Sequence, residues 1–157
     1  RDRSVSRGLG DVYKRQKLYG LAGVRLGYAM CNKEMHAILQ KCTSVFTGSR
    51  VALAGAMAAL DDEEYIKKTK AAMLEGRKYL TDEFTKMGFY VYPSETNFLY
   101  VNTGYNAAEF AEECKKYGLI IRGNFDYSRI TVGRMDQNEK MVGIIKKIIE
   151  SGELKKI

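Results

Sequence analysis

The chain has 157 residues, 45% of them hydrophobic and 29% charged, with a formal net charge of +7 at pH 7. Its length and apolar content are enough for about one domain with a buried core, and no apolar run approaches the roughly 18 residues that span a bilayer. The single histidine, His36, argues against a histidine-based metal site or a Ser-His-Asp triad. Three scattered cysteines favour the reducing cytoplasm over a disulfide framework. We therefore expect a cytoplasmic protein without a metal site or a membrane span.

Residues 1–16 read as a non-native, adapter-like leader and are excluded from the interpretation of the fold. Back-translated, residues 11–16 give GAT GTG TAT AAG AGA CAG, which matches the mosaic end of a transposase-based sequencing adapter. Residues 6–10 fit the adapter sequence upstream of that end. A natural basic N-terminal arm is the alternative interpretation of these residues.

The leader also distorts the charge of the chain. It holds five Lys/Arg and two Asp/Glu residues, so the remaining residues carry +4 rather than +7. That excess is modest, and no basic run is interleaved with aromatic residues. The sequence therefore does not favour nucleic acid as a partner.

Up to residue 87 the sequence predicts one strand and three helices. Residues 24–31 alternate like a strand, residues 33–41 form a short amphipathic helix, and the alanine-rich residues 50–60 form a buried helix. The acidic residues 61–64 should begin a long helix reaching about Met87, because acidic side chains favour the positive N-terminal end of a helix. Its core-facing stripe recurs every seven residues and consists of Ile66, Met73, Leu80 and Met87, with Phe84 on the same face.

Beyond Gly88 the pattern changes to short strands alternating with two helices. The expected strands are residues 89–92, 97–102, 119–122 and 129–132, and the expected helices are residues 107–117 and 137–149. Two helices packed on a small, mostly antiparallel sheet form an α+β layer. We therefore expect an α+β domain at the C-terminal end of the chain.

The most informative motif spans residues 17–28, which read Lys-Leu-Tyr-Gly-Leu-Ala-Gly-Val-Arg-Leu-Gly-Tyr. Lys17 precedes Arg25 by eight residues, across a loop of small and apolar side chains. A lysine among apolar neighbours keeps more of its amine unprotonated and able to attack an aldehyde. An arginine offers a planar fork for a phosphate group. Because pyridoxal phosphate carries both an aldehyde and a phosphate, the pair predicts that cofactor.

This segment resembles the cofactor-lysine motif of fold-type-I aminotransferases, roughly Ser-Lys-x-Tyr/Phe-Gly/Ala-Leu-Ala-Gly-x-Arg-x-Gly-Tyr, and above all its histidinol-phosphate branch. The resemblance implies that Lys17 is the catalytic Schiff-base lysine, which binds the cofactor and moves the proton at the substrate Cα. It implies that Arg25 binds the cofactor phosphate. Gln16 stands where the family has serine, and whether it replaces a native serine stays open.

The resemblance runs from Lys17 almost to the C-terminus and implies an α/β fragment of the pyridoxal-phosphate-dependent transferase fold. Residues 17–45 would be the C-terminal end of the large cofactor-binding domain, and residues 46–87 the bridging helices. Residues 88–157 would be the small C-terminal α+β domain. The family's aspartate for the pyridine nitrogen, its ring-stacking aromatic residue and its glycine-rich phosphate turn all precede the lysine. We therefore expect the fragment by itself to be inactive.

Arg129 opens the sequence Arg-Ile-Thr-Val-Gly, which resembles the family's Leu-Arg-Ile-Thr/Ser-Val/Ile-Gly. There the arginine grips the substrate carboxylate bidentately, which lysine cannot do. Arg129 would bind the α-carboxylate of glutamate in one half-reaction and a substrate phosphate in the other. Arg122 is a weaker candidate for the same task. The segment Pro-Ser-Glu-Thr-Asn-Phe at residues 93–98 resembles the family's Pro-Ser-x-x-Asn-Phe, in which Asn97 should fix the turn.

The resemblance thus implies a homodimeric transaminase of histidine biosynthesis, moving an amino group between an amino acid such as glutamate and a keto or aldehyde partner. The histidinol phosphate and imidazole acetol phosphate pair is the expected partner. An aromatic aminotransferase and a threonine-phosphate decarboxylase remain open within the same fold. From another class, a non-catalytic basic binding module remains open.

Deleting residues 1–16 tests the leader interpretation. These residues are rich in Gly, Ser and Arg and lack an apolar period, so their removal should leave the melting temperature unchanged. Thermal unfolding of the two chains, followed by circular dichroism, measures this. A clearly lower melting temperature in the shortened chain would show that these residues belong to the folded protein.

Overall fold

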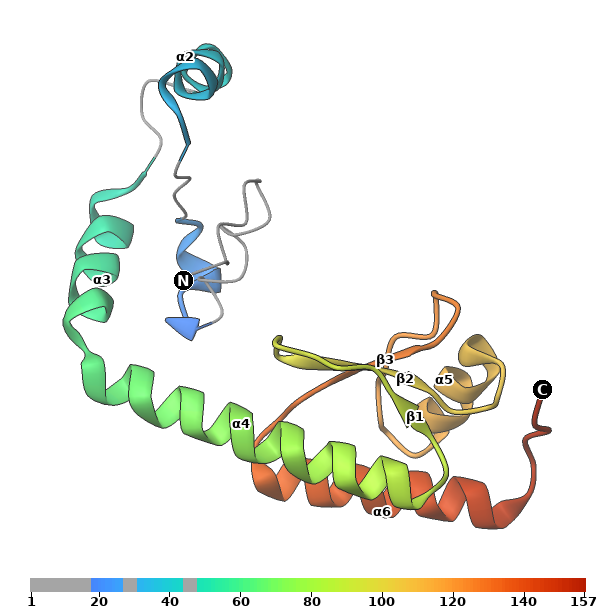
Figure 1. The fold of residues 1–157 in the computed structure, drawn as a ribbon. Helices are drawn as coiled ribbons and strands as arrows, with labels where there is room; N and C mark the ends of the chain where they lie inside the picture. Colours follow the sequence, from blue (N-terminus) through green and yellow to red (C-terminus); the bar gives the residue numbers. More distant parts are fainter. Residues whose placement is uncertain (1–17, 27–30, 44–47) are drawn as a thin grey trace. The chain divides into compact units, whose positions relative to one another are not determined.

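The computed structural model describes residues 18–26, 31–43 and 48–157 (Figure 1). The chain forms two compact units, Arg1–Thr69 and Lys70–Ile157. The leader at residues 1–16 and the expected cofactor lysine, Lys17, lie outside the described residues. The predictions made for them therefore stay predictions.

The first unit contains helical elements: η1 (Ala22–Val24), α2 (Lys33–Cys42), α3 (Arg50–Asp61) and the beginning of α4 (Glu63–Lys86). The expected helix at residues 33–41 is confirmed. Side-chain oxygens cap the N-termini of α2 and α3, because Asn32 accepts from the Met35 amide at 2.9 Å and Ser49 accepts from the Ala52 amide at 3.1 Å. These caps satisfy amide groups that have no partner inside their helix.

Two expectations for this unit are wrong. The strand expected at residues 24–31 is not formed where the structure describes it. Val24 ends the short helix η1 and Arg25 has a left-handed φ of 54°, while residues 27–30 lie outside the described residues. Helix α3 forms as expected but is not buried. Of its side chains only Ala52 is buried, whereas Val51 is 78% exposed and Met57 is 68% exposed. The described residues do not cover these apolar side chains of α3.

Helix α4 continues from the first unit into the second and carries the expected core stripe. Its N-terminus is capped by Asp62, which accepts from the Tyr65 amide at 2.9 Å, and its first turn is acidic as expected. Leu80 and Phe84 are fully buried, and Met73 and Met87 pack against the same core. Ile66, which begins the stripe, lies in the first unit and is half-buried there.

The second unit is a three-stranded antiparallel sheet in the order β1 (Tyr90–Val91), β2 (Phe98–Asn102) and β3 (Ser128–Thr131), packed with helices (Figure 1). Helices α5 (Ala107–Lys116) and α6 (Met135–Ser151) confirm the two helices expected there. Alternate strand residues point into the core, so that Leu99, Val101 and Ile130 are 1% exposed or less. The expected α+β layer is confirmed.

The strand expected at residues 119–122 is wrong and is reduced to a single bridge between Arg122 and Arg129. Ile120 is 85% exposed, so the apolar run that suggested a strand is not core-facing throughout. Gly123 then lies so close to helix α5 that a Cβ atom there would overlap the carbonyl of Ala107. The segment therefore turns against α5 instead of extending along β3.

Within the described ranges, no helix is both long enough and apolar enough to cross a membrane. Among those same residues there is no group of three or more His, Cys, Asp or Glu side chains that could hold a metal ion.

Glu83 links helices α4 and α6 in the second unit. Its side chain is 14% exposed and accepts from the Nζ atoms of Lys86 at 2.6 Å and of Lys146 at 2.8 Å. Hydrogen bonds from Lys146 and then Lys86 lower the pKa of Glu83 from 4.5 to about 2. Because folding lowers this pKa, the ionised carboxylate stabilises the fold above about pH 4.5, and this stabilisation is lost as the pH falls towards 2.

Replacing Glu83 by glutamine should therefore destabilise the chain most at neutral pH. The difference in unfolding free energy between the parent chain and Glu83→Gln should shrink as the pH falls from about 5 to about 2. Urea unfolding at several pH values measures it. Glu112→Gln is the matched control, because Glu112 pairs with Lys115 at an exposed site and should matter little at pH 7. A Glu83→Gln effect that stays constant down to pH 2 would contradict this assignment.

Candidate anion-binding site

Arg25 lies in a turn that exposes its guanidinium. The turn begins at Gly20, which has a φ of +65°, and an added Cβ there would lie 3.0 Å from the Tyr65 hydroxyl oxygen of α4. The left-handed φ favours glycine at this position, since L residues rarely adopt it. Nη1 of Arg25 donates to the Ala22 carbonyl at 3.2 Å, which occupies one of the five N–H donors of an exposed side chain. Within residues 18–26, 31–43 and 48–157 no other hydrogen bond to the Arg25 guanidinium is formed, so the remaining donors can serve an anion.

Arg129 lies on the outer face of the sheet, opposite the core. It is paired with Tyr100 of β2, and its neighbours in the strand, Ser128 and Ile130, are buried on the other face. The guanidinium carbon of Arg129 lies 4.0 Å from the centroid of the Phe98 ring. Its Nε atom is buried and has no hydrogen-bond partner among the described residues. In residues 18–26, 31–43 and 48–157 no carboxylate forms an ion pair with Arg129.

Arg122 pairs with Arg129 along the edge of β3 that faces away from β2. The amide of Arg122 donates to the carbonyl of Arg129 at 3.1 Å, and the amide of Arg129 donates back at 2.9 Å. Residues that exchange both hydrogen bonds in an antiparallel pair have Cα atoms about 5.5 Å apart, with side chains on the same face. The two arginines that the sequence singled out separately are therefore cross-strand neighbours.

The turn after β3 holds the C-terminal end of that strand in place. The side chain of Asn138, which is fully buried in α6, accepts from the Gly133 amide at 2.8 Å and donates to the Gly133 carbonyl at 3.0 Å. At the beginning of α6, the amide of Arg134 donates to the Gln137 side chain at 3.1 Å. The Arg-Ile-Thr-Val-Gly motif thus ends in a turn whose backbone hydrogen bonds are satisfied by buried or capping side chains.

A cluster of three tyrosines includes Tyr100, the residue of β2 that is paired with Arg129. Tyr92, Tyr100 and Tyr127 have ring centroids 5.6 Å from one another. A hydrogen bond to Tyr127 raises the pKa of the Tyr92 hydroxyl above its ordinary value. Sequence reasoning assigned no role to Tyr100 and did not detect the contact between Phe98 and Arg129. The alternation of Phe98 and Tyr100 within one strand was the available signal, because both must point to the face opposite Leu99.

Comparison with known proteins identifies the family. The family model described as "Aminotransferase class I and II" matches residues 17–145, which is most of the chain. The chain belongs to the class I and II aminotransferase family. The match begins at the expected cofactor lysine, directly after the proposed leader.

Among curated relatives, the chain is similar to histidinol-phosphate aminotransferases. It is 38% identical over 145 residues to that of Methanopyrus kandleri, covering 85% of this chain and 37% of the relative. It is 37% identical over 141 residues to that of Symbiobacterium thermophilum, covering 87% of this chain and 39% of the relative. The chain therefore spans about two fifths of the length of the curated relatives it matches.

A solved structure supports the same family. The histidinol-phosphate aminotransferase from Sinorhizobium meliloti, in complex with pyridoxal-5'-phosphate, is 26% identical and superposes with a TM-score of 0.74. The superposition covers 85% of this chain and 39% of that structure. The expected fold class, a part of the fold of these aminotransferases, is thereby confirmed.

Proposed function

We propose that this chain is the C-terminal part of a pyridoxal-phosphate-dependent aminotransferase that exchanges amino groups between glutamate and the histidinol phosphate and imidazole acetol phosphate pair. The family match and the names of the relatives support this activity. The observation that carries the substrate assignment is the backbone pairing of Arg122 with Arg129, whose guanidinium lies on an aromatic ring without a carboxylate partner among the described residues.

The chemistry of the donor set fits the cofactor. Lys17 offers an amine for an aldehyde, and the exposed guanidinium of Arg25 offers N–H donors for a phosphate. When bound, pyridoxal phosphate supplies an electron sink for the substrate Cα. Arg25 would then hold the phosphate, and Lys17 would take and return the proton at the substrate Cα.

Arg129 and Arg122 would bind the anionic end of both substrates. Like charges directly opposite each other in a sheet destabilise it, and an anion between the two guanidiniums relieves that repulsion. A guanidinium can grip a carboxylate or a phosphate with two parallel hydrogen bonds. The same pair can therefore take the α-carboxylate of glutamate in one half-reaction and the phosphate of histidinol phosphate in the other.

The remaining parts of the proposal concern the whole enzyme. Residues 17–45 would be the end of its large domain, residues 46–87 the bridging helices and residues 88–157 the small domain. The uncovered apolar side chains of α3 are consistent with further chain packing on that helix. We propose a homodimer, and we expect residues 1–157 alone to be inactive because only Lys17 and Arg25 of the proposed cofactor contacts are present.

Replacing Arg129 by lysine in the whole enzyme should weaken substrate binding without loss of cofactor. A charged fork lost from a desolvated site costs on the order of 2–5 kcal/mol, or roughly thirty- to several-thousand-fold in binding. The KM for glutamate should rise steeply and the affinity for histidinol phosphate should fall in the same variant. Steady-state kinetics and the visible absorbance of the bound cofactor measure the two effects separately.

Arg134→Lys is the matched control for that variant, because Arg134 is exposed and pairs with Asp136 at the beginning of α6. It should leave the KM for both substrates unchanged. If Arg129→Lys also leaves glutamate kinetics unchanged, Arg129 is not the substrate arginine, and the assignment moves to Arg122.

A further inference from the structure

The segment at residues 93–98, to which the proposed function assigns no role, ends at the ring that supports Arg129. Phe98 is paired with Thr131, two residues beyond Arg129 in β3, so the two side chains are diagonal neighbours on the outer face of the sheet. A guanidinium whose carbon lies 4.0 Å from a ring centroid is attracted by the negative face of that ring. The contact with the ring uses no N–H donor, so the terminal N–H groups of the guanidinium can still bond a ligand.

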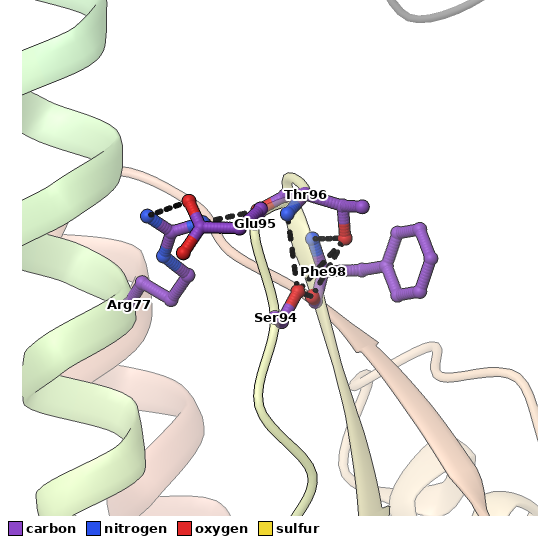
Figure 2. A network of polar contacts seen from close by, with 5 residues as sticks. All are labelled: Arg77, Ser94, Glu95, Thr96 and Phe98. Atoms are coloured by element: carbon purple, nitrogen blue, oxygen red, sulfur yellow. Dashed lines mark hydrogen bonds and ion pairs between the residues drawn. The ribbon is translucent and has the colours of Figure 1, made fainter. Parts of the chain in front are cut away.

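On the β1 side, two hydroxyl groups rather than a strand hold the backbone of Phe98. Backbone pairing between the β1 segment and β2 ends at Tyr92, whose amide donates to the Tyr100 carbonyl at 3.0 Å. Pro93 follows and has no amide hydrogen. Ser94 Oγ and Thr96 Oγ1 instead donate to the Phe98 carbonyl at 2.7 Å and 3.0 Å, as Figure 2 shows. The hydroxyls complete the sheet edge at the residue that supports Arg129.

Arg77 connects this turn to helix α4 (Figure 2). Its side chain is 15% exposed, its Nη1 donates to the Thr96 carbonyl at 3.4 Å, and its Nη2 lies 3.6 Å from the Glu95 carboxylate. On the β3 side, the Val132 amide donates to the Asn97 carbonyl at 2.9 Å. The turn is therefore held from both sides, and the backbone of Phe98 is held with it.

We propose that Phe98 is a positioning residue that holds the Arg129 guanidinium ready for an anion, and that the turn at residues 93–97 serves to fix Phe98. This inference rests on the proposed function of Arg129. A mobile arginine loses rotamer freedom when it binds a ligand, which weakens binding. A guanidinium already lying on a fixed ring has less freedom to lose, so its anion binds more tightly.

The test uses the 157-residue chain and inorganic phosphate as the probe, with Phe98→Leu as the main variant. Leucine is apolar but has no aromatic face. In the parent chain the Nε–Hε group of Arg129 should show a heteronuclear NOE close to that of core backbone amides. In Phe98→Leu the NOE of this Arg129 group should fall to the value shown by the Nε–Hε group of the exposed Arg122. The phosphate dissociation constant, followed at the same signal, should rise about three- to thirty-fold.

Two matched variants separate the ring contact from general packing. Phe98→Tyr keeps the aromatic face and should restore both measurements. Phe125→Leu removes an exposed aromatic ring that packs on Tyr100, and it should change neither measurement. If Phe98→Leu proves unfolded by its melting curve, Ser94→Ala combined with Thr96→Val carries the same expectation, because it releases the Phe98 backbone.

The outcomes distinguish this inference from the proposed function. One outcome is that Arg129→Lys abolishes phosphate binding while Phe98→Leu leaves the phosphate dissociation constant unchanged. It would overturn the positioning role of Phe98 and would still support Arg129 as the anion-binding residue. An unchanged phosphate response in Arg129→Lys, or no response in the parent chain, would instead count against Arg129 as the anion site.

Discussion

The pairing register of β2 and β3 is the constraint on which the proposed substrate half of the site depends. Because strand side chains alternate between faces, placing Leu99 and Ile130 in the core forces Tyr100 and Arg129 onto the opposite face. A slip of one residue would bury the arginine and expose the isoleucine, so core burial and arginine placement are specified together. The same register brings Phe98 diagonally beneath the guanidinium.

Helices and strands with a strong period were predictable from the sequence. The stripe that includes Leu80 and Phe84 has helical spacing, and Asp62 caps the helix as its position indicated. The sequence could not show that residues 119–122 form no strand. Their apolar content does not reveal that Gly123 lies directly against helix α5. The burial of α3 was also wrongly predicted, since an alanine-rich sequence indicates a packed helix without showing what packs on it.

The candidate site divides in the same way. Arg129 could be singled out because its motif resembles a known one, and Arg122 was only a weak candidate from its sequence. The backbone bridge between them strengthens Arg122 as a candidate, because it places the two arginines directly opposite each other. The support from Phe98 depends on a diagonal contact between strands, which requires the register. No local pattern in residues 93–98 shows that Ser94 and Thr96 replace a missing strand partner at that position.

The proposed cofactor half of the site lies around Arg25, where a tight turn at Gly20 leaves the guanidinium exposed. Lys17 begins both the motif and the family match. The most direct test is to reduce the whole enzyme with borohydride in the presence of pyridoxal phosphate and to map the labelled peptide by mass spectrometry. We expect a single pyridoxyl group, on Lys17. A label on another lysine, or no stable label at all, would contradict this assignment.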